Sequence, residues 1–273
     1  MDLTIITINY NNRAGLARTL ESVRNQDIRG FQYVVVDGGS TDGSVDLINE
    51  YQDIITDWVS ERDNGIYNAM NKGVAMAMRS HCLFLNSGDV LHAPDVIRQV
   101  KHHGLDRDIV FGRVVNVFPG NKDRLYIPEE EMSLLLIIQT GIHHAGSFIS
   151  TKLMQKYHYD ETLKICSDRK FFIEALVIDN CSMKTIPVTV CDFEMGGVSN
   201  TSPLKLIADE KSRIMNSLFP PRIIYDYNRT NVRIQKMTAR LVRSREKIIS
   251  LVCKADEAFL SLCRLVLGHR AGR

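Results

Sequence analysis

Short apolar runs alternate with amphipathic segments along the first hundred residues of the chain. Leu3–Ile8 and Phe31–Val36 are rich in β-branched residues and are bounded by polar turn residues, which predicts two buried strands. Between them, Leu16, Leu20 and Val23 recur at spacings of four and three, which predicts an amphipathic helix. The further elements predicted in this half are a helix after Thr41 or Asp42, a strand at Asp57–Ser60, a helix at Asn68–Arg79, a strand at His81–Leu85 and a helix from Pro94.

This repeated strand–helix order predicts an α/β fold with a mostly parallel sheet and helices on both faces. After Asn116 the pattern is less regular, with strands predicted at Ser147–Ser150 and Met183–Val190 and a helix at Asp168–Val177. We expect these elements to extend the same sheet. Pro220-Pro221 interrupts the helical pattern and predicts a boundary, so we expect a domain at 1–221 and a basic amphipathic helical tail at 222–273.

Composition and charge refine this division. The chain has 273 residues, of which 44% are apolar and 24% charged, as is usual for a globular protein. The tail holds 12 Lys or Arg against 4 Asp or Glu, while the remainder has 22 basic and 28 acidic residues. Such a basic tail favours an anionic membrane surface as partner. The alternative is packing on its own domain or on a second subunit, which leaves an oligomer open. An acidic body and few aromatic residues among the basic ones argue against nucleic acid.

The chain shows no apolar run near the ~20 residues that a membrane span needs. The first strand follows Met1-Asp2 directly, with no basic segment before it, so we expect no signal peptide. The expected location is therefore the cytoplasm, at the inner face of the membrane if the tail binds lipid. The six cysteines form no CxxC pair, which favours free thiols over a zinc site or a disulfide framework.

Acidic residues follow three of the predicted strands. Asp37 follows the second strand, Asp63 the third and Asp89 the fourth. In parallel sheets of this kind, ligands bind beyond the carboxyl ends of the strands. These carboxylates are therefore expected to gather around one ligand.

A nucleotide suits this group because base and ribose present N–H and O–H donors that a carboxylate accepts. Asp37 and Asp63 are the main candidates, and Thr7 and Asn9 at the end of the first strand are assigned to the same nucleotide site. The alternative for Asp37 and Asp63 is turn and helix-cap chemistry, since Asp-Gly is a turn signal.

A divalent cation is the second expected ligand. Asp89 is the metal candidate, because Mg²⁺ or Mn²⁺ takes one or two carboxylates together with diphosphate oxygens, and Asn86 could add a neutral oxygen. Lys72, on a helix that starts near the same edge, could meet phosphate. The alternatives are a turn or cap residue for Asp89, a residue that only shapes the turn for Asn86, and a solvated lysine for Lys72.

Two further motifs lie in the second half. Asp168 opens a predicted helix, where it is either an N-cap or a general base that takes a proton from an acceptor hydroxyl. The pair His143-His144 has no third ligand at metal-site spacing, so it either touches an acceptor or phosphate or packs in the core.

Three ordered motifs give the chain a resemblance to a known family. They are the runs Val34–Gly43 (VVVDGGSTDG), Ser60–Gly73 (SERDNGIYNAMNKG) and Phe84–Asp89 (FLNSGD). Together they resemble the family 2 (GT-A) glycosyltransferases, closest to bacterial exopolysaccharide enzymes of the colanic-acid type. The resemblance covers about residues 1–200, including the segment Gly196–Ser199.

The resemblance implies a GT-A fold and an inverting, metal-dependent transfer from a nucleotide-sugar, with a UDP-sugar expected, to a saccharide or lipid-linked saccharide. Asp37 and Asp63 match nucleotide-contacting positions, and Asp168 matches the catalytic base. Asn86–Asp89 takes the place of the DxD metal motif, with Asn replacing the first acid. Two other classes remain open, a non-catalytic nucleotide-sugar-binding module and a sugar-nucleotide pyrophosphorylase. The latter usually opens with a Gly-rich loop, which Leu3–Asn12 lacks.

Overall fold

The computed structural model of the chain describes residues 2–118, 120, 122–196, 202–230, 232–233 and 236. The chain separates into two units, Met1–Leu218 and Phe219–Arg273, and each is described by itself. Gly197–Ser199 and most of the predicted basic amphipathic helix in the tail lie outside the described residues.

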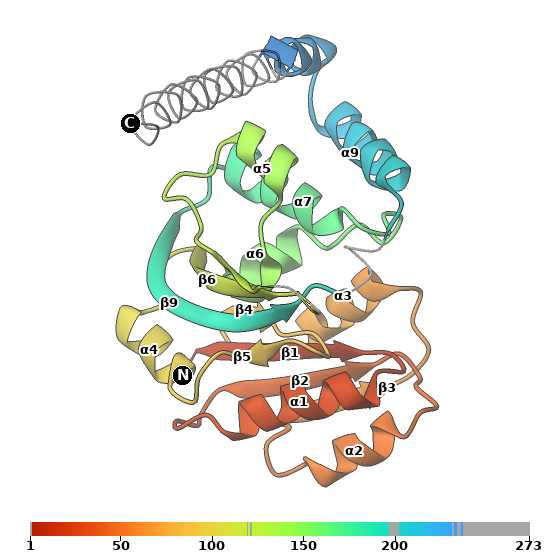
Figure 1. The fold of residues 1–273 in the computed structure, drawn as a ribbon, viewed down its shortest axis with the longest axis vertical. Coiled ribbons are helices and arrows are strands. Elements are labelled where there is room, and N and C mark those ends of the chain that lie inside the picture. Colours follow the sequence, from red (N-terminus) through yellow and green to blue (C-terminus); the bar gives the residue numbers. More distant parts are fainter. Residues whose placement is uncertain are drawn as a thin grey trace, which may run out of the picture. The chain divides into compact units, whose positions relative to one another are not determined.

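The first half of unit 1 is a parallel sheet. Its strands are β1 (Leu3–Asn9), β2 (Gln32–Asp37), β3 (Asp57–Ser60) and β4 (His81–Phe84), in the order β3-β2-β1-β4. The helices α1 (Arg13–Arg24), α2 (Ser44–Glu50) and α3 (Ile66–Met76) connect them (Figure 1). The predicted α/β class is therefore confirmed, together with the predicted order of these elements.

The second half continues the same sheet with mixed directions. β4 pairs antiparallel with β8, β8 antiparallel with β6, β6 parallel with β9, and β9 antiparallel with β5. These strands are β5 (Val90–Leu91), β6 (Ile109–Val117), β8 (Ser147–Ser150) and β9 (Met183–Glu194), with β7 (Arg124–Tyr126) paired to β6. The remaining elements are α4 (Val96–His103), α5 (Leu134–Thr140), η1 (His144–Gly146), α6 (Thr151–Lys156), α7 (Ser167–Phe172), η2 (Ile173–Ile178) and α9 (Leu204–Leu218). The long strand β9, which lies between β6 and β5 in the sheet, is strongly curved in Figure 1.

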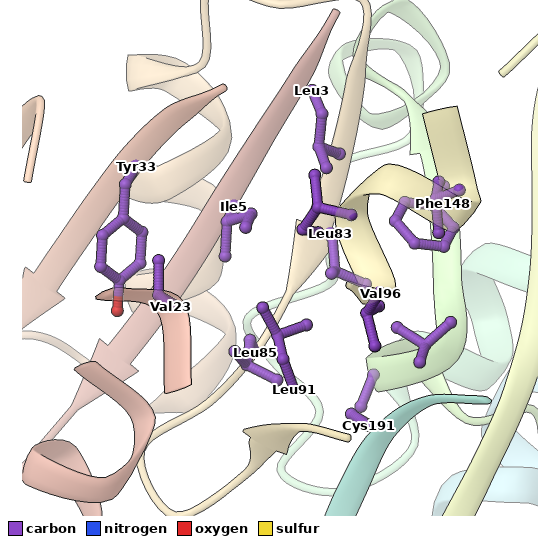
Figure 2. Packing of buried hydrophobic residues seen from close by; sticks show 14 of the residues in the cluster. Leu3, Ile5, Val23, Tyr33, Leu83, Leu85, Leu91, Val96, Phe148 and Cys191 are labelled. Atoms are coloured by element: carbon purple, nitrogen blue, oxygen red, sulfur yellow. The ribbon is translucent and has the colours of Figure 1, made fainter. Parts of the chain in front are cut away.

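The strands β1 and β2 are buried along their whole length, which explains their nearly continuous apolar sequences. On one face, Leu3 and Ile5 of β1 pack in a cluster with Val23 of α1, Leu83 of β4 and Val96 of α4 (Figure 2). The other face of β1 and β2 is covered by α3. This packing fixes the carboxyl ends of the parallel strands, where the predicted site residues lie.

The helix after Asp42 begins slightly later than predicted. α2 starts at Ser44, and Gly43 is its N-cap. Gly43 has a left-handed φ of 88°, which is not helical and which glycine adopts readily, so the helix cannot begin before it. Asp42 still assists, since its Oδ1 accepts hydrogen bonds from the Ser44 backbone N–H at 3.1 Å and from the Ser44 hydroxyl at 2.6 Å.

In unit 2, residues 221–230 are helical, and the side chains of Ile223 and Tyr225 are exposed. Within the part of the chain that the structure describes, we find no helix of the length and apolar character required for a membrane span.

Candidate functional site

The carboxyl ends of β1, β2 and β3 align in one row of polar residues. The strand register pairs Asn9 with Asp37 and Asp37 with Ser60. The Asp37 carboxylate accepts five hydrogen bonds, from Asn9 Nδ2 (2.8 Å), the Ser60 hydroxyl (2.6 Å), the Ser40 hydroxyl (2.6 Å) and the backbone N–H groups of Gly39 (3.2 Å) and Ser40 (2.9 Å). Asp37 thereby fixes the loop that follows β2.

Burial of the Asp37 carboxylate opposes its ionisation, but the hydrogen bonds from Ser40, Ser60 and Asn9 outweigh that effect, and its pKa lies below the ordinary value. The group is therefore charged at neutral pH, and its oxygens are already engaged. A neighbouring atom is less satisfied, since Asn9 Oδ1 is buried and has no hydrogen-bond partner within the described part of the chain.

Asp63 lies against the loop that Asp37 organises. A Cβ atom placed on Gly38 would come within 2.4 Å of Asp63 Oδ2 and 3.2 Å of a ring carbon of Tyr10, so a larger residue at position 38 would displace the Asp63 carboxylate. The Tyr10 side chain is 65% exposed. Asp63 and Tyr10 thus lie beside the same glycine, and Tyr10 is a candidate that the sequence interpretation missed, although it directly follows Asn9.

The loop between β1 and α1 joins the β2 loop to the turn after β4. The Asn11 backbone N–H donates to the Ser40 hydroxyl and the Thr41 N–H donates to Asn11 Oδ1, both at 2.8 Å. On the other side, Asn12 Nδ2 donates to the Ser87 carbonyl at 3.1 Å, and the Ser87 hydroxyl donates to the Asn12 carbonyl at 3.2 Å. The predicted nucleotide loop and the Asn86–Asp89 turn are therefore connected by hydrogen bonds.

Asp89 is almost fully buried at the end of that turn, with 4% exposure. Its Oδ1 accepts from the Glu194 backbone N–H of β9 at 3.1 Å. Burial, assisted by the negative charge of Glu194, raises the pKa of Asp89 to about 7. Gly88 has a φ of +111°, and a Cβ there would lie 2.7 Å from Glu194 Oε2. Glu194 in turn pairs with Arg18 at 2.7 Å.

His144 lies between Asn86 and Asp168 and approaches both of them. Asn86 Nδ2 lies 3.0 Å from His144 Nε2, and His144 Nδ1 lies 4.0 Å from Asp168 Oδ2. The other end of the Asn86 amide, Oδ1, is buried, and none of the described residues provides it with a hydrogen-bond partner. The structure therefore brings the predicted base to the predicted metal turn through a histidine, although the three residues are far apart in sequence.

Burial shifts the pKa values of both Asp168 and His144 toward their neutral forms. Desolvation raises the pKa of Asp168 to about 6, against the opposing influence of the Arg169 charge. Desolvation lowers the pKa of His144 to about 4, and it does the same for His143 with help from His144. The ring of His143 contacts those of Tyr126 and Phe193, with centroid distances of 4.7 and 5.3 Å. At pH 7 Asp168 is mainly ionised and both histidines are neutral.

Asp168 lies in the first turn of α7, directly after a segment that is bound by a buried carboxylate. Glu210 of α9 is 2% exposed and accepts hydrogen bonds from the backbone N–H groups of Lys164 (2.7 Å), Ile165 (3.0 Å) and Cys166 (3.0 Å). Cys166 is the N-cap of α7. Glu210 therefore anchors the segment that leads into Asp168, a role that no local sequence signal indicated.

Two predicted residues are engaged elsewhere. Thr7 is fully buried, and its hydroxyl donates to the Leu85 carbonyl at 2.7 Å and lies 3.0 Å from the Tyr33 hydroxyl. Lys72 Nζ pairs with Glu61 at 2.7 Å and donates to the Arg62 carbonyl at 3.3 Å. Their predicted contacts with a nucleotide stay predictions.

The metal prediction rests on few ligands. Among the residues that the structure describes, no group of three or more His, Cys, Asp or Glu is arranged to hold a metal ion. The available set is the Asp89 carboxylate and the unpartnered Asn86 Oδ1, both hard oxygen donors of the kind that Mg²⁺ and Mn²⁺ prefer. Those cations commonly complete their coordination with water and phosphate oxygens, so a two-residue oxygen set fits them.

Comparison with known proteins gives a consistent result. The model of the family "Glycosyl transferase family 2" matches residues 4–160. A Mycobacterium tuberculosis protein described as a PGL/p-HBAD biosynthesis glycosyltransferase is 33% identical over 215 residues, which cover 72% of this chain and 79% of that protein.

Solved structures share the fold at lower identity. TarS of S. aureus, crystallised as residues 1–349 with UDP-GlcNAc, aligns with a TM-score of 0.61 and 19% identity, covering 79% of this chain and 70% of that one. The mannosyltransferase PcManGT of Pyrobaculum calidifontis, in complex with GDP-Man and Mn²⁺, aligns with a TM-score of 0.52 and 17% identity, covering 70% and 56% respectively.

Proposed function

The chain belongs to glycosyl transferase family 2, and we propose that it is an inverting, metal-dependent enzyme that moves a sugar from a UDP-sugar to a saccharide or lipid-linked saccharide during polysaccharide biosynthesis. The observation that carries this proposal is the position of the Asp168 carboxylate, which is separated from the Asn86–Asp89 turn by the imidazole of His144 alone. The description of the M. tuberculosis relative as a PGL/p-HBAD biosynthesis glycosyltransferase supports a biosynthetic role.

The nucleotide is proposed to lie at the ends of β1, β2 and β3. The buried, unpartnered Asn9 Oδ1 needs an N–H donor, which a uracil base supplies. Tyr10 offers an exposed aromatic face for stacking, and Asp63 offers a carboxylate beside Gly38 for ribose or base. Asp37 contributes by fixing this loop. The TarS complex with UDP-GlcNAc supports a uridine nucleotide as donor.

Asp89 and Asn86 are proposed to hold Mg²⁺ or Mn²⁺. The bound cation would act as a Lewis acid that neutralises negative charge on the departing diphosphate. Because metal binding requires a deprotonated carboxylate, the raised pKa of Asp89 predicts that affinity for the metal increases with pH through neutrality. The Mn²⁺ in the PcManGT complex supports this assignment.

Asp168 is proposed to be the general base. Its carboxylate accepts the proton of an acceptor hydroxyl while that oxygen forms a bond to the anomeric carbon. The bond from that carbon to the nucleotide diphosphate breaks on the opposite face, which inverts the configuration. A pKa of about 6 keeps Asp168 ionised at neutral pH, yet makes it a stronger base than an ordinary aspartate.

The experiment that tests the proposal compares the wild type with Asp168→Asn. We expect Asp168→Asn to bind UDP with unchanged affinity by calorimetry and to lose transfer from UDP-sugars by ~10²–10⁴-fold in the presence of Mn²⁺. Asp179→Asn is the matched control, because Asp179 pairs with Lys156 away from the site. Full turnover of Asp168→Asn would remove Asp168 from this role. UDP binding without any sugar release by the wild type would favour a non-catalytic binding module.

We further propose that residues 1–221 form the transferase domain and that the basic residues of 222–273 attach it to an anionic membrane. The support is the concentration of 12 basic against 4 acidic residues in the tail. Packing of the tail on the protein itself or on a second subunit is the alternative.

A further inference from the structure

The contact between His144 and Asn86 indicates why an amide rather than a carboxylate suits position 86. A neutral imidazole has one N–H and one lone pair, so the partner of each ring nitrogen determines where the proton lies. One side of His144 faces a carboxylate, because Nδ1 lies 4.0 Å from Asp168 Oδ2. This distance exceeds that of a hydrogen bond, but catalytic contacts often shorten only when substrate is bound.

The charge of Asp168 favours the proton on Nδ1. Nε2 then carries the lone pair and must accept a hydrogen bond, which Asn86 Nδ2 supplies at 3.0 Å. An Asn amide that donates from Nδ2 holds Oδ1 away from the ring, and this oxygen is buried with no partner among the residues that the structure describes. The orientation of the Asn86 oxygen is thus linked to the charge of Asp168 through the imidazole.

We propose that His144 is a positioning residue that holds Asp168 and the Asn86 amide in matched orientations, and so couples the acceptor side of the site to its donor side. The inference rests on the proposed function of Asp168 and of the Asn86–Asp89 turn. It also assigns a reason to Asn86. An Asp at position 86 could only accept, so it would move the imidazole proton to Nε2 and turn the Nδ1 lone pair toward Asp168.

The direct test is the tautomer of His144 in the full-length protein without ligands. We expect long-range ¹H–¹⁵N correlation spectra at pH 7.5 to show a protonated Nδ1 and an unprotonated Nε2. The His144 signals are identified by their loss in His144→Gln, and His102, which is exposed on α4, serves as the internal reference. In Asn86→Asp we expect the proton on Nε2 or on both nitrogens. A wild-type ring that is protonated on Nε2 would overturn the proposal.

The tautomer of His144 is measured without turnover. An unexpected tautomer would therefore overturn the positioning role and leave the glycosyltransferase assignment intact, and a protein without transferase activity could still show the expected tautomer. A kinetic test adds the functional consequence, with Mn²⁺ and UDP-sugar hydrolysis as the probe reaction. His144→Gln can accept from Asn86 but has no N–H at the Nδ1 position, so we expect kcat to fall about 10–100-fold with KM for the UDP-sugar unchanged.

A double-mutant cycle tests the match between the two residues. Asn86→Asp combined with His144→Gln should lose less activity than the product of the single losses, because the Gln amide can donate to the new carboxylate. Multiplicative losses together with an equal rise in KM would show that His144 only fills space, and would overturn the positioning role.

Discussion

At the scale of single residues, the site contains carboxylates that folding leaves in unfavourable surroundings. Desolvation raises the pKa values of Asp89 to about 7 and of Asp168 to about 6. Asp37 has the opposite balance, because its five hydrogen bonds favour the charged form. The ionised form of Asp37 therefore stabilises the folded protein, whereas the ionised forms of Asp89 and Asp168 destabilise it. Strongly shifted pKa values of this kind are common at functional sites.

The raised pKa of Asp168 predicts that Asp168→Asn stabilises the protein at high pH. The native state keeps the Asp168 proton up to about pH 6, whereas the unfolded chain loses it near 3.8, so the free energy of unfolding of the wild type decreases between these values. Removing the charge should therefore raise the free energy of unfolding by about 1–3 kcal/mol at pH 8 and change it little at pH 4. Urea denaturation at the two pH values measures this difference.

Tyr67 and Tyr159 face Asp168 from other elements, and their pKa values lie well above the ordinary value of 10 because they are desolvated, so both phenols stay neutral at pH 4 and at pH 8. Asp179→Asn serves as the control with the opposite sign, because Lys156 lowers the pKa of Asp179. A destabilised Asp168→Asn at pH 8 would contradict the expected cost of its ionisation.

The unpartnered oxygen of Asn9 carries a second residue-scale prediction. Asn9→Ala removes the acceptor proposed for the base and also the Nδ2 donor to Asp37, so affinity for UDP should fall by about 10-fold or more. Asn9→Asp keeps an acceptor but places a second carboxylate against Asp37, and should bind no better than Asn9→Ala. Calorimetric titration with UDP measures both, and undiminished affinity in Asn9→Ala would separate Asn9 from the nucleotide site.

At the scale of elements, the α7 segment with Asp168 depends on α9. Glu210 accepts from three consecutive backbone N–H groups, and Glu210→Gln replaces one accepting oxygen with an NH₂ group that faces those donors. We expect the free energy of unfolding to fall by about 2–4 kcal/mol, since a buried, hydrogen-bonded charge loses its match. Chemical denaturation measures the loss.

The neighbouring exposed acid provides the control for this prediction. Asp209→Asn lies on the same helix and should change the free energy of unfolding by less than about 0.5 kcal/mol. Equal stability of the two variants would show that Glu210 does not anchor the segment before α7.

Some of the helices and strands could be predicted from local sequence patterns, and others could not. β1 to β4 and the helices between them were predictable, because buried parallel strands and amphipathic helices have local signatures. β5 was not, since it has two residues and pairs Val90 with Asp192, about a hundred positions away. α5 had a readable signal that was missed, because the Ser133 side chain caps the apolar run at Leu136 N.

The site divides in the same way. The positions of Asp37, Asp63 and Asp89 could be predicted because each follows a strand with a clear local pattern, and their strand ends meet at one edge. Their roles toward a nucleotide and a metal stay predictions. The partners that complete them come from distant segments. Glu194 reaches Asp89, Glu210 reaches Cys166 and His144 reaches Asn86 only through tertiary packing. Such contacts depend on how the second half curls along the sheet, and no spacing in a single sequence encodes that.

At the scale of the whole molecule, the charge distribution predicts preferential binding to anionic membranes. Each basic residue near such a surface contributes ~1 kcal/mol, so three reversals should remove most binding. The variant carries Arg233→Glu, Lys236→Glu and Arg240→Glu in the full-length chain. We expect the wild type to sediment with vesicles that contain anionic lipid at low salt, and the variant to remain in the supernatant.

A charge-matched control separates the tail from net charge alone. Lys101→Glu, Lys122→Glu and Lys152→Glu change the same number of exposed basic side chains in unit 1, and this protein should still bind the vesicles. Equal loss in both variants would mean that overall charge, rather than the tail, governs attachment. If the wild type does not sediment with anionic vesicles but forms a dimer by light scattering, packing of the tail on a second subunit is favoured instead. The basic residues would then contact protein rather than lipid.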